Sequence, residues 1–141
     1  MKLFVDTSGW VALLDRKDPR HPRVTHVYRD RAGAGGTILT SDYVLAETLN
    51  VLFLHRPFAE GWRFAQWALA AMAQKQLSVE QVTQGRFLQA LDMKKQFAEI
   101  TGLSFTDLTT VVLLSESGTK EILSGNAQFR RVGLGFHVLP E

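Results

Sequence analysis

Four polar residues, far apart in the chain, lie in sequence contexts that could serve metal chemistry. Asp6 directly follows the apolar residues 3–5, and Glu47 projects from the apolar stripe of a helical segment. Asp107 lies in the first turn of another apolar helical segment, and Asn126 follows a short apolar run. Each also has an ordinary structural explanation: a helix cap for the aspartates, an ion pair for the glutamate and a turn for the asparagine.

If the fold brings these side chains together, their negative charges favour the binding of a cation. Carboxylates within a few ångströms of one another repel and take up protons unless a cation neutralises them. The chain has no cysteine, and its four histidines show no metal-ligand spacing, so all donors would be oxygens. An oxygen-only set favours hard ions, Mg²⁺ or Mn²⁺. The chemistry that such ions serve best is the attack of water on a phosphodiester.

The elements that must position these residues alternate along the chain. Apolar runs typical of buried strands are predicted at residues 3–5, 37–40, 121–123 and 136–139. Segments of helical period separate them, and several begin with capping residues: Thr7 and Ser8, Ser41 and Asp42, and Ser104 with Asp107. This alternation predicts one α/β domain over residues 1–141, a three-layer α/β/α sandwich with a mostly parallel central sheet. Ligands of such sheets bind at the carboxyl ends of the strands, where Asp6 and Asn126 are expected.

Residues 58–97 show no strand-like run. Ser78 and Gln81 have the spacing of a capping box, so two helices are expected in this stretch. The first of them is unusually apolar, with large side chains at Trp62, Phe64, Trp67, Leu69 and Met72. Core packing is the favoured interpretation of this surface, and a partner-binding or self-association groove is the alternative.

Composition limits the class of protein. The chain has 141 residues and a net charge of +2, which fits one domain and does not by itself indicate a nucleic-acid or membrane surface. The absence of cysteine excludes disulfides and thiolate metal sites and is compatible with a reducing cytosol. No apolar stretch approaches the roughly 20 residues that a membrane helix needs. We therefore expect a cytoplasmic protein that does not enter a membrane.

The four positions lie in segments that together resemble the motifs of PIN-domain ribonucleases, most closely the VapC-type toxins of bacterial and archaeal toxin–antitoxin pairs. The segments are residues 5–8, 41–48, 104–107 and 124–129, and the resemblance extends from Lys2 to about Pro140. It implies that Asp6 and Asp107 bind the metal and that Glu47 belongs to the same acidic cluster.

The resemblance also implies that Thr7, Ser8 and Ser124 support the pocket. The family's fourth motif commonly has Asp where this chain has Asn126, so one formal negative charge is missing. An amide oxygen can still bind Mg²⁺ or orient a water molecule. Because hard cations gain chiefly from anionic ligands, we expect the departure to weaken a second ion most.

The function that the resemblance implies is Mg²⁺- or Mn²⁺-dependent endonucleolytic hydrolysis of RNA, with a VapB-type antitoxin and a second copy of the chain as partners. The alternative is a catalytically weak or silent PIN-like module that binds RNA or a protein. Outside the three acids the chain has an excess of five positive charges, which suits a phosphate chain. The predicted contacts to the RNA backbone include Arg16, Lys17, Arg20, Arg130 and Arg131.

Overall fold

Four of the five strands form where the apolar runs lie in the sequence. In the computed structural model, which describes residues 1–141, all five pair in parallel and in the order β3-β2-β1-β4-β5. Their bounds are β1 Lys2–Val5, β2 Thr37–Ser41, β3 Ser78–Glu80, β4 Glu121–Leu123 and β5 His137–Leu139. The predicted α/β class with a parallel central sheet is confirmed.

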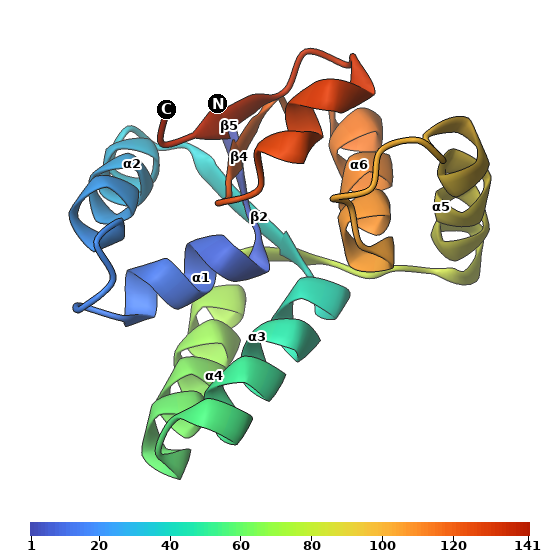
Figure 1. Cartoon of the computed structure of the whole chain (residues 1–141). Coiled ribbons are helices and arrows are strands. Elements are labelled where there is room, and N and C mark those ends of the chain that lie inside the picture. The colour runs from blue at the N-terminus through green and yellow to red at the C-terminus, as the bar shows by residue number, and fades with distance from the viewer.

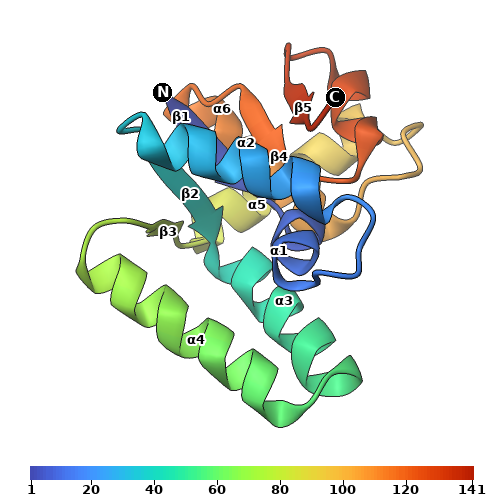
Figure 2. The ribbon, with the colours of Figure 1, turned by 90° about the vertical axis from the view of Figure 1, so that its left-hand side faces the viewer.

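Helices cover both faces of this sheet (Figure 1). Helices α1 and α2 lie on one side and α5 and α6 on the other, while α3 and α4 form a hairpin beyond the carboxyl end of β2 (Figure 2). The bounds are α1 Thr7–Leu14, α2 His21–Gly33, α3 Asp42–His55, α4 Phe58–Ala73, α5 Gln84–Gln96, α6 Phe105–Ser117 and the short 3₁₀ helix η1 Ala127–Val132. None of the helices is both long and apolar enough to cross a membrane.

The predicted N-caps form at α3 and α6, the helices that carry Glu47 and Asp107. Ser41 Oγ accepts a hydrogen bond of 3.0 Å from the backbone N–H of Val44 at the start of α3. Ser104 and Asp107 form a reciprocal capping box at the start of α6. These caps fix where each helix begins and therefore where its first-turn side chains point.

The prediction for residues 58–97 is wrong in one respect. Ser78 does not cap a helix, because residues 78–80 form the edge strand β3, which pairs with the end of β2. The second helix of this stretch, α5, begins five positions later and is capped by Thr83, whose Oγ accepts from the N–H of Arg86 at 3.3 Å. A three-residue edge strand with half-buried side chains leaves too short an alternation to be detected in the sequence.

The apolar surface of α4 is also more exposed than the favoured interpretation predicts. Phe64 is buried with 3% exposure, but Trp62 and Leu69 are 50% and 66% exposed. The core lies instead around β1, β4 and α6, where residues 108–114 are all buried because the sheet covers one side of α6 and α5 the other. Helix α4 therefore presents most of its large apolar side chains outward.

Candidate active site

The site lies at the carboxyl edge of the sheet, between β1 and β4. After β1 the chain adds β2 and β3 on one side, and it later adds β4 and β5 on the other. Such a reversal of strand order opens a crevice beyond the ends of the two central strands. Asp6 follows β1 there, its N–H donates to the carbonyl of Leu123 at 3.1 Å, and its residue exposure is only 4%.

The turn that follows β4 holds Asp6 in place. Ser124 Oγ donates to Asp6 Oδ2 at 2.8 Å and accepts from the N–H of Asn126 at 3.0 Å. The N–H of Gly125 donates to Ser8 Oγ at 2.8 Å. Side chains predicted to support the pocket therefore tie the start of α1 to the turn after β4.

A glycine on α1 makes this close approach possible. A Cβ at Gly9 would collide with the backbone carbonyl oxygen of Leu123, the last residue of β4. A backbone atom of a central strand cannot move aside as the end of a flexible side chain can. Gly9 therefore lets the first turn of α1, which carries Thr7 and Ser8, lie directly against the strand end.

Glu47 reaches the same edge from α3. Thr7 Oγ1 donates to Glu47 Oε1 at 2.9 Å, across 40 positions of sequence. The side chain of Glu47 is half-buried, and its other oxygen accepts no hydrogen bond within the chain. The predicted position of this carboxylate on an inward face of its helix agrees with this contact.

Asp107 reaches the site from the first turn of α6. Its Oδ2 accepts from the N–H of Ser104 at 2.9 Å and from Nδ2 of Asn126 at 3.2 Å, while Oδ1 accepts no hydrogen bond within the chain. The capping explanation and the functional one are therefore compatible, because one oxygen caps the helix and the other is free.

The amide of Asn126 is oriented by three contacts. Its Nδ2 donates to the carbonyl of Gly102 at 2.8 Å and to Asp107, and its Oδ1 accepts from the N–H of Gln128 at 3.0 Å. Turning the amide over would face an oxygen toward a carbonyl and a carboxylate. Asn126 therefore presents donors to the acidic site, whereas an amide oxygen available to an ion was expected.

The three acids share one electrostatic environment. Burial, followed by the nearby charge of Asp107, raises the pKa of Asp6 from 3.8 to about 6, and Glu47 adds to this effect. Burial also raises the pKa of Asp107, with a smaller contribution from the charge of Glu47. None of the three forms a salt bridge with a basic side chain. Negative charge therefore accumulates in this crevice without a counterion from the chain.

The donor set suits a hard divalent cation. All side-chain donors are carboxylate or hydroxyl oxygens, and Asp107 Oδ1 and Glu47 Oε2 are free to bind one. No three Asp, Glu or His side chains are close enough together to bind a single ion as they stand. The oxygen donors of the site would therefore suit Mg²⁺ or Mn²⁺, with water supplying further ligands.

The five basic residues that are predicted to contact the RNA backbone differ in their surroundings. Arg20 lies against the turn at Gly125, whereas Arg130 donates to the carbonyl of Val138 at 3.2 Å and Arg131 to Gln128 at 3.0 Å. The side chains of Arg16 and Lys17 are exposed and make no hydrogen bond within the chain. The contact between Arg20 and Asp18 was not foreseen, although an Asp two positions before an Arg in a predicted turn could have indicated it.

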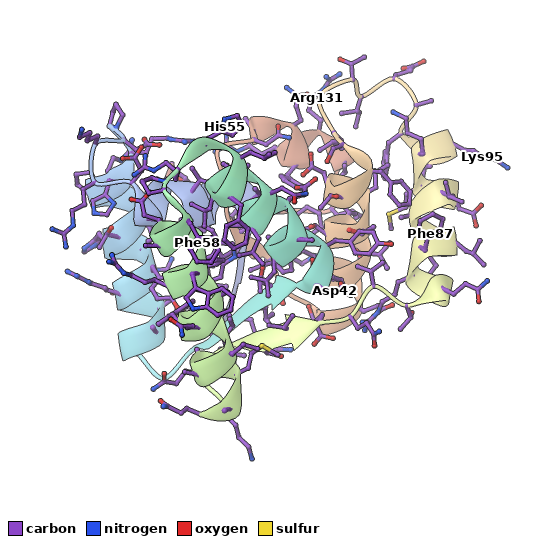
Figure 3. All side chains as sticks on the ribbon, turned by 90° about the horizontal axis from the view of Figure 1, so that it is seen from below. Asp42, His55, Phe58, Phe87, Lys95 and Arg131 are labelled. Atoms are coloured by element: carbon purple, nitrogen blue, oxygen red, sulfur yellow. The ribbon has the colours of Figure 1, made fainter.

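The molecule also has an apolar groove, whose lining includes none of the acidic-site residues and which sequence reasoning only partly anticipated. Its volume is about 640 Å³, and residues of α1, α2, α3 and α4 line it. Trp10 contacts the aromatic rings of Tyr28, Phe64 and Trp67 here, with ring centroids 5.4–6.0 Å apart. Figure 3 places Phe58 on the α3–α4 side of the molecule and Phe87 on α5, so exposed aromatic side chains occur on two separate surfaces.

Comparison with known proteins decides the family. The family model described as PIN domain matches residues 3–134. The chain belongs to the PIN domain family. It is 30% identical, over 139 residues and 99% of both chains, to the "23S rRNA-specific endonuclease VapC20" of Mycobacterium tuberculosis, and two strains give the same values.

The fold agrees with a solved PIN-domain structure. The crystal structure of M. tuberculosis VapC20, described as a "Sarcin-Ricin loop cleaving toxin", superimposes with a TM-score of 0.75 and 27% identity, covering 93% of this chain and 95% of that one. The predicted membership of the VapC-type PIN ribonucleases is confirmed. The roles of individual site residues stay predictions.

Proposed function

We propose that this chain is the toxin of a VapBC-type pair, an endoribonuclease that requires Mg²⁺ or Mn²⁺. In this proposal Asp6 and Asp107 bind the ion, and Glu47 binds it directly or through water. The observation that carries the proposal is the burial of Asp6 beside two other acids, with no basic side chain paired to any of them. A bound divalent ion would activate a water molecule and offset the charge that develops on the scissile phosphate.

The surrounding side chains hold the acids ready. Ser124 donates to Asp6, Thr7 donates to Glu47, and the capping box fixes the first turn of α6. Each contact uses one carboxylate oxygen and selects one side-chain conformation. Preorganised ligands of this kind lower the free energy that ion binding spends on ordering side chains.

For the substrate, we propose a structured loop of ribosomal RNA. The support is the relative named as a 23S rRNA-specific endonuclease, which aligns with 99% of this chain. The related crystal structure is that of a toxin described as "Sarcin-Ricin loop cleaving". A hairpin that contains the sarcin–ricin loop is therefore the first RNA to test.

For the partner, we propose that a segment of a VapB-type antitoxin occupies the apolar groove between α1 and α4. Its aromatic lining, centred on Trp10 and Trp67, would bury the apolar side chains of such a segment. The predicted homodimer has an exposed apolar surface available where Phe53, Phe58 and Trp62 stack in sequence. Light scattering after size-exclusion chromatography measures the assembly with and without antitoxin.

The function is tested by incubating the hairpin RNA with the purified chain in Mg²⁺, in Mn²⁺ and in EDTA. Cleavage is expected with either ion and not in EDTA. Asp107→Asn should reduce cleavage by at least about 100-fold, because it removes an anionic ligand but keeps an oxygen for the helix cap. Asp92→Asn, the same change at an exposed position of α5, is the matched control. RNA binding without cleavage in either metal would instead support the silent module.

A further inference from the structure

Arg20 lies across the turn that supports the acidic site. A Cβ at Gly125 would overlap Arg20 Nη1 and would lie 3.6 Å from Ser8 Oγ. Gly125 directly follows Ser124, which donates to Asp6. The guanidinium of Arg20 therefore packs against the same short turn in which Ser124 holds the buried carboxylate.

This guanidinium is held in a fixed orientation. Its Nε and Nη2 donate to the two carboxylate oxygens of Asp18 at 3.2 and 3.0 Å, and the N–H of Arg20 also donates to Asp18, at 2.8 Å. The Asp18 side chain is 14% exposed and that of Arg20 is 47% exposed. A two-point contact of this kind fixes the plane of the guanidinium while leaving it open to solvent.

The remaining nitrogen of the group is unused. Nη1 donates no hydrogen bond within the chain, and it lies against the turn at Gly125. Arg20 also forms no ion pair with Asp6, Glu47 or Asp107. Asp18 neutralises the formal charge of the pair, but it uses only Nε and Nη2, so Nη1 stays free to donate to a further acceptor.

The other predicted RNA contacts lack this combination. Arg130 and Arg131 donate to partners within the chain, and Arg16 and Lys17 are exposed without a contact that fixes them. Only Arg20 combines a fixed plane, a free donor nitrogen and direct packing on the turn of the acidic site.

We propose that Arg20 binds a backbone phosphate of the RNA adjacent to the scissile one, through Nη1, and so positions the strand over the acidic site. The inference rests on the proposed ribonuclease function and assigns one phosphate-binding side chain within it. Asp18 acts as the positioning residue for the guanidinium. Gly125 is required because any larger residue would push the guanidinium off the turn.

The test compares Arg20→Ala, Gly125→Ala and Arg56→Ala in the full chain. Arg56 is the matched control, because it makes the same two-point contact with a carboxylate, from Nε and Nη2 to Glu60 at 2.8 and 3.1 Å, but at the far end of α3. Binding of a fluorescein-labelled sarcin–ricin hairpin RNA is measured by anisotropy in EDTA across a salt series. Values of kcat and KM for cleavage are then measured in Mg²⁺.

Arg20→Ala should raise both Kd and KM about tenfold, as expected for one charge-assisted hydrogen bond. It should also reduce the slope of log Kd against log salt by about 0.7 to 1. Arg56→Ala should change Kd by less than about twofold. Gly125→Ala keeps every charge but displaces the guanidinium, so it should raise Kd about three- to tenfold, and adding it to Arg20→Ala should have no further effect.

The inference fails if Arg20→Ala binds RNA as Arg56→Ala does, or if the effects of Arg20→Ala and Gly125→Ala multiply. It also fails if the unmodified chain does not bind the hairpin. These results are separable from failure of the proposed function. Absence of cleavage in Mg²⁺ together with weaker binding by Arg20→Ala in EDTA would overturn the nuclease proposal and leave the phosphate site standing. Circular dichroism and thermal melting show that each variant folds.

Discussion

Replacing Asp6 with asparagine should stabilise the metal-free chain at neutral pH. Burial and the charge of Asp107 raise the pKa of Asp6 from 3.8 to about 6. Between these values the folded chain binds more protons than the unfolded chain, so the free energy of unfolding falls as the pH rises. The contribution of protonated Asp6 to the free energy of unfolding is fully present below pH 3.8 and is lost as the pH rises through about 6. An ionised Asp6 therefore opposes folding when no cation is bound.

The size of this effect follows from the pKa difference. The change from 3.8 to about 6 corresponds to about 3 kcal/mol at pH 7, since a pKa difference of one is worth about 1.4 kcal/mol. Asparagine has the same shape and does not ionise, and the hydroxyl of Ser124 can turn to accept from the new amide. Allowing about 1 kcal/mol for that rearrangement leaves a gain of about 2 kcal/mol. This is roughly 7 °C in Tm for a domain of this size.

The assay is thermal unfolding in EDTA at pH 7 and pH 4, followed by circular dichroism. At pH 4 the gain should disappear, because the carboxyl of the unmodified chain is then protonated in the folded state and only the cost of the rearrangement at Ser124 remains. Mg²⁺ at pH 7 should stabilise the unmodified chain more than Asp6→Asn. Asp92→Asn, at an exposed position, controls for the loss of one charge. A variant that is less stable than the unmodified chain by the same amount at both pH values would refute the reasoning.

Two further substitutions test the site and its support. Asn126→Asp replaces the donor that faces Asp107 with an anion, so it should tighten Mg²⁺ binding about tenfold by calorimetry and lower the Tm in EDTA; unchanged affinity would exclude the side chain from the ion site. Gly9→Ala should lower the free energy of unfolding by about 2 kcal/mol because its Cβ meets a backbone carbonyl, whereas Gly33→Ala, with open space around it, should be neutral in the same melts.

Much of the scaffold is predictable because it depends on local patterns. The runs at residues 3–5 and 121–123 are apolar enough to identify two central strands, and the serine caps at Ser41 and Ser104 identify two helix starts. Parallel pairing then follows from the alternation of strands and helices. Together these patterns place Asp6 and the turn after β4 at one edge of the sheet before any coordinates are known.

The parts that could not be predicted depend on which surface an element meets. Helix α4 has large apolar side chains around much of its circumference, so its sequence does not say which of them contact the core; Phe64 does, and Leu69 does not. Strand β3 is equally ambiguous, because three residues at a sheet edge carry no measurable period. Tertiary contacts decide both cases, and local propensity does not.

At the site itself, Asn126 is the residue whose role the sequence predicts least well. The residue type suggests an oxygen for a metal ion, and its position after a strand suggests a turn. The structure gives it both a turn contact, to the N–H of Gln128, and a donor contact, to Asp107. Which end of an amide faces an acid depends on Gly102 and Gln128, two neighbours that no spacing rule connects to it. The observed outcome is that the amide donates a hydrogen bond to Asp107 and so helps to hold that carboxylate in place.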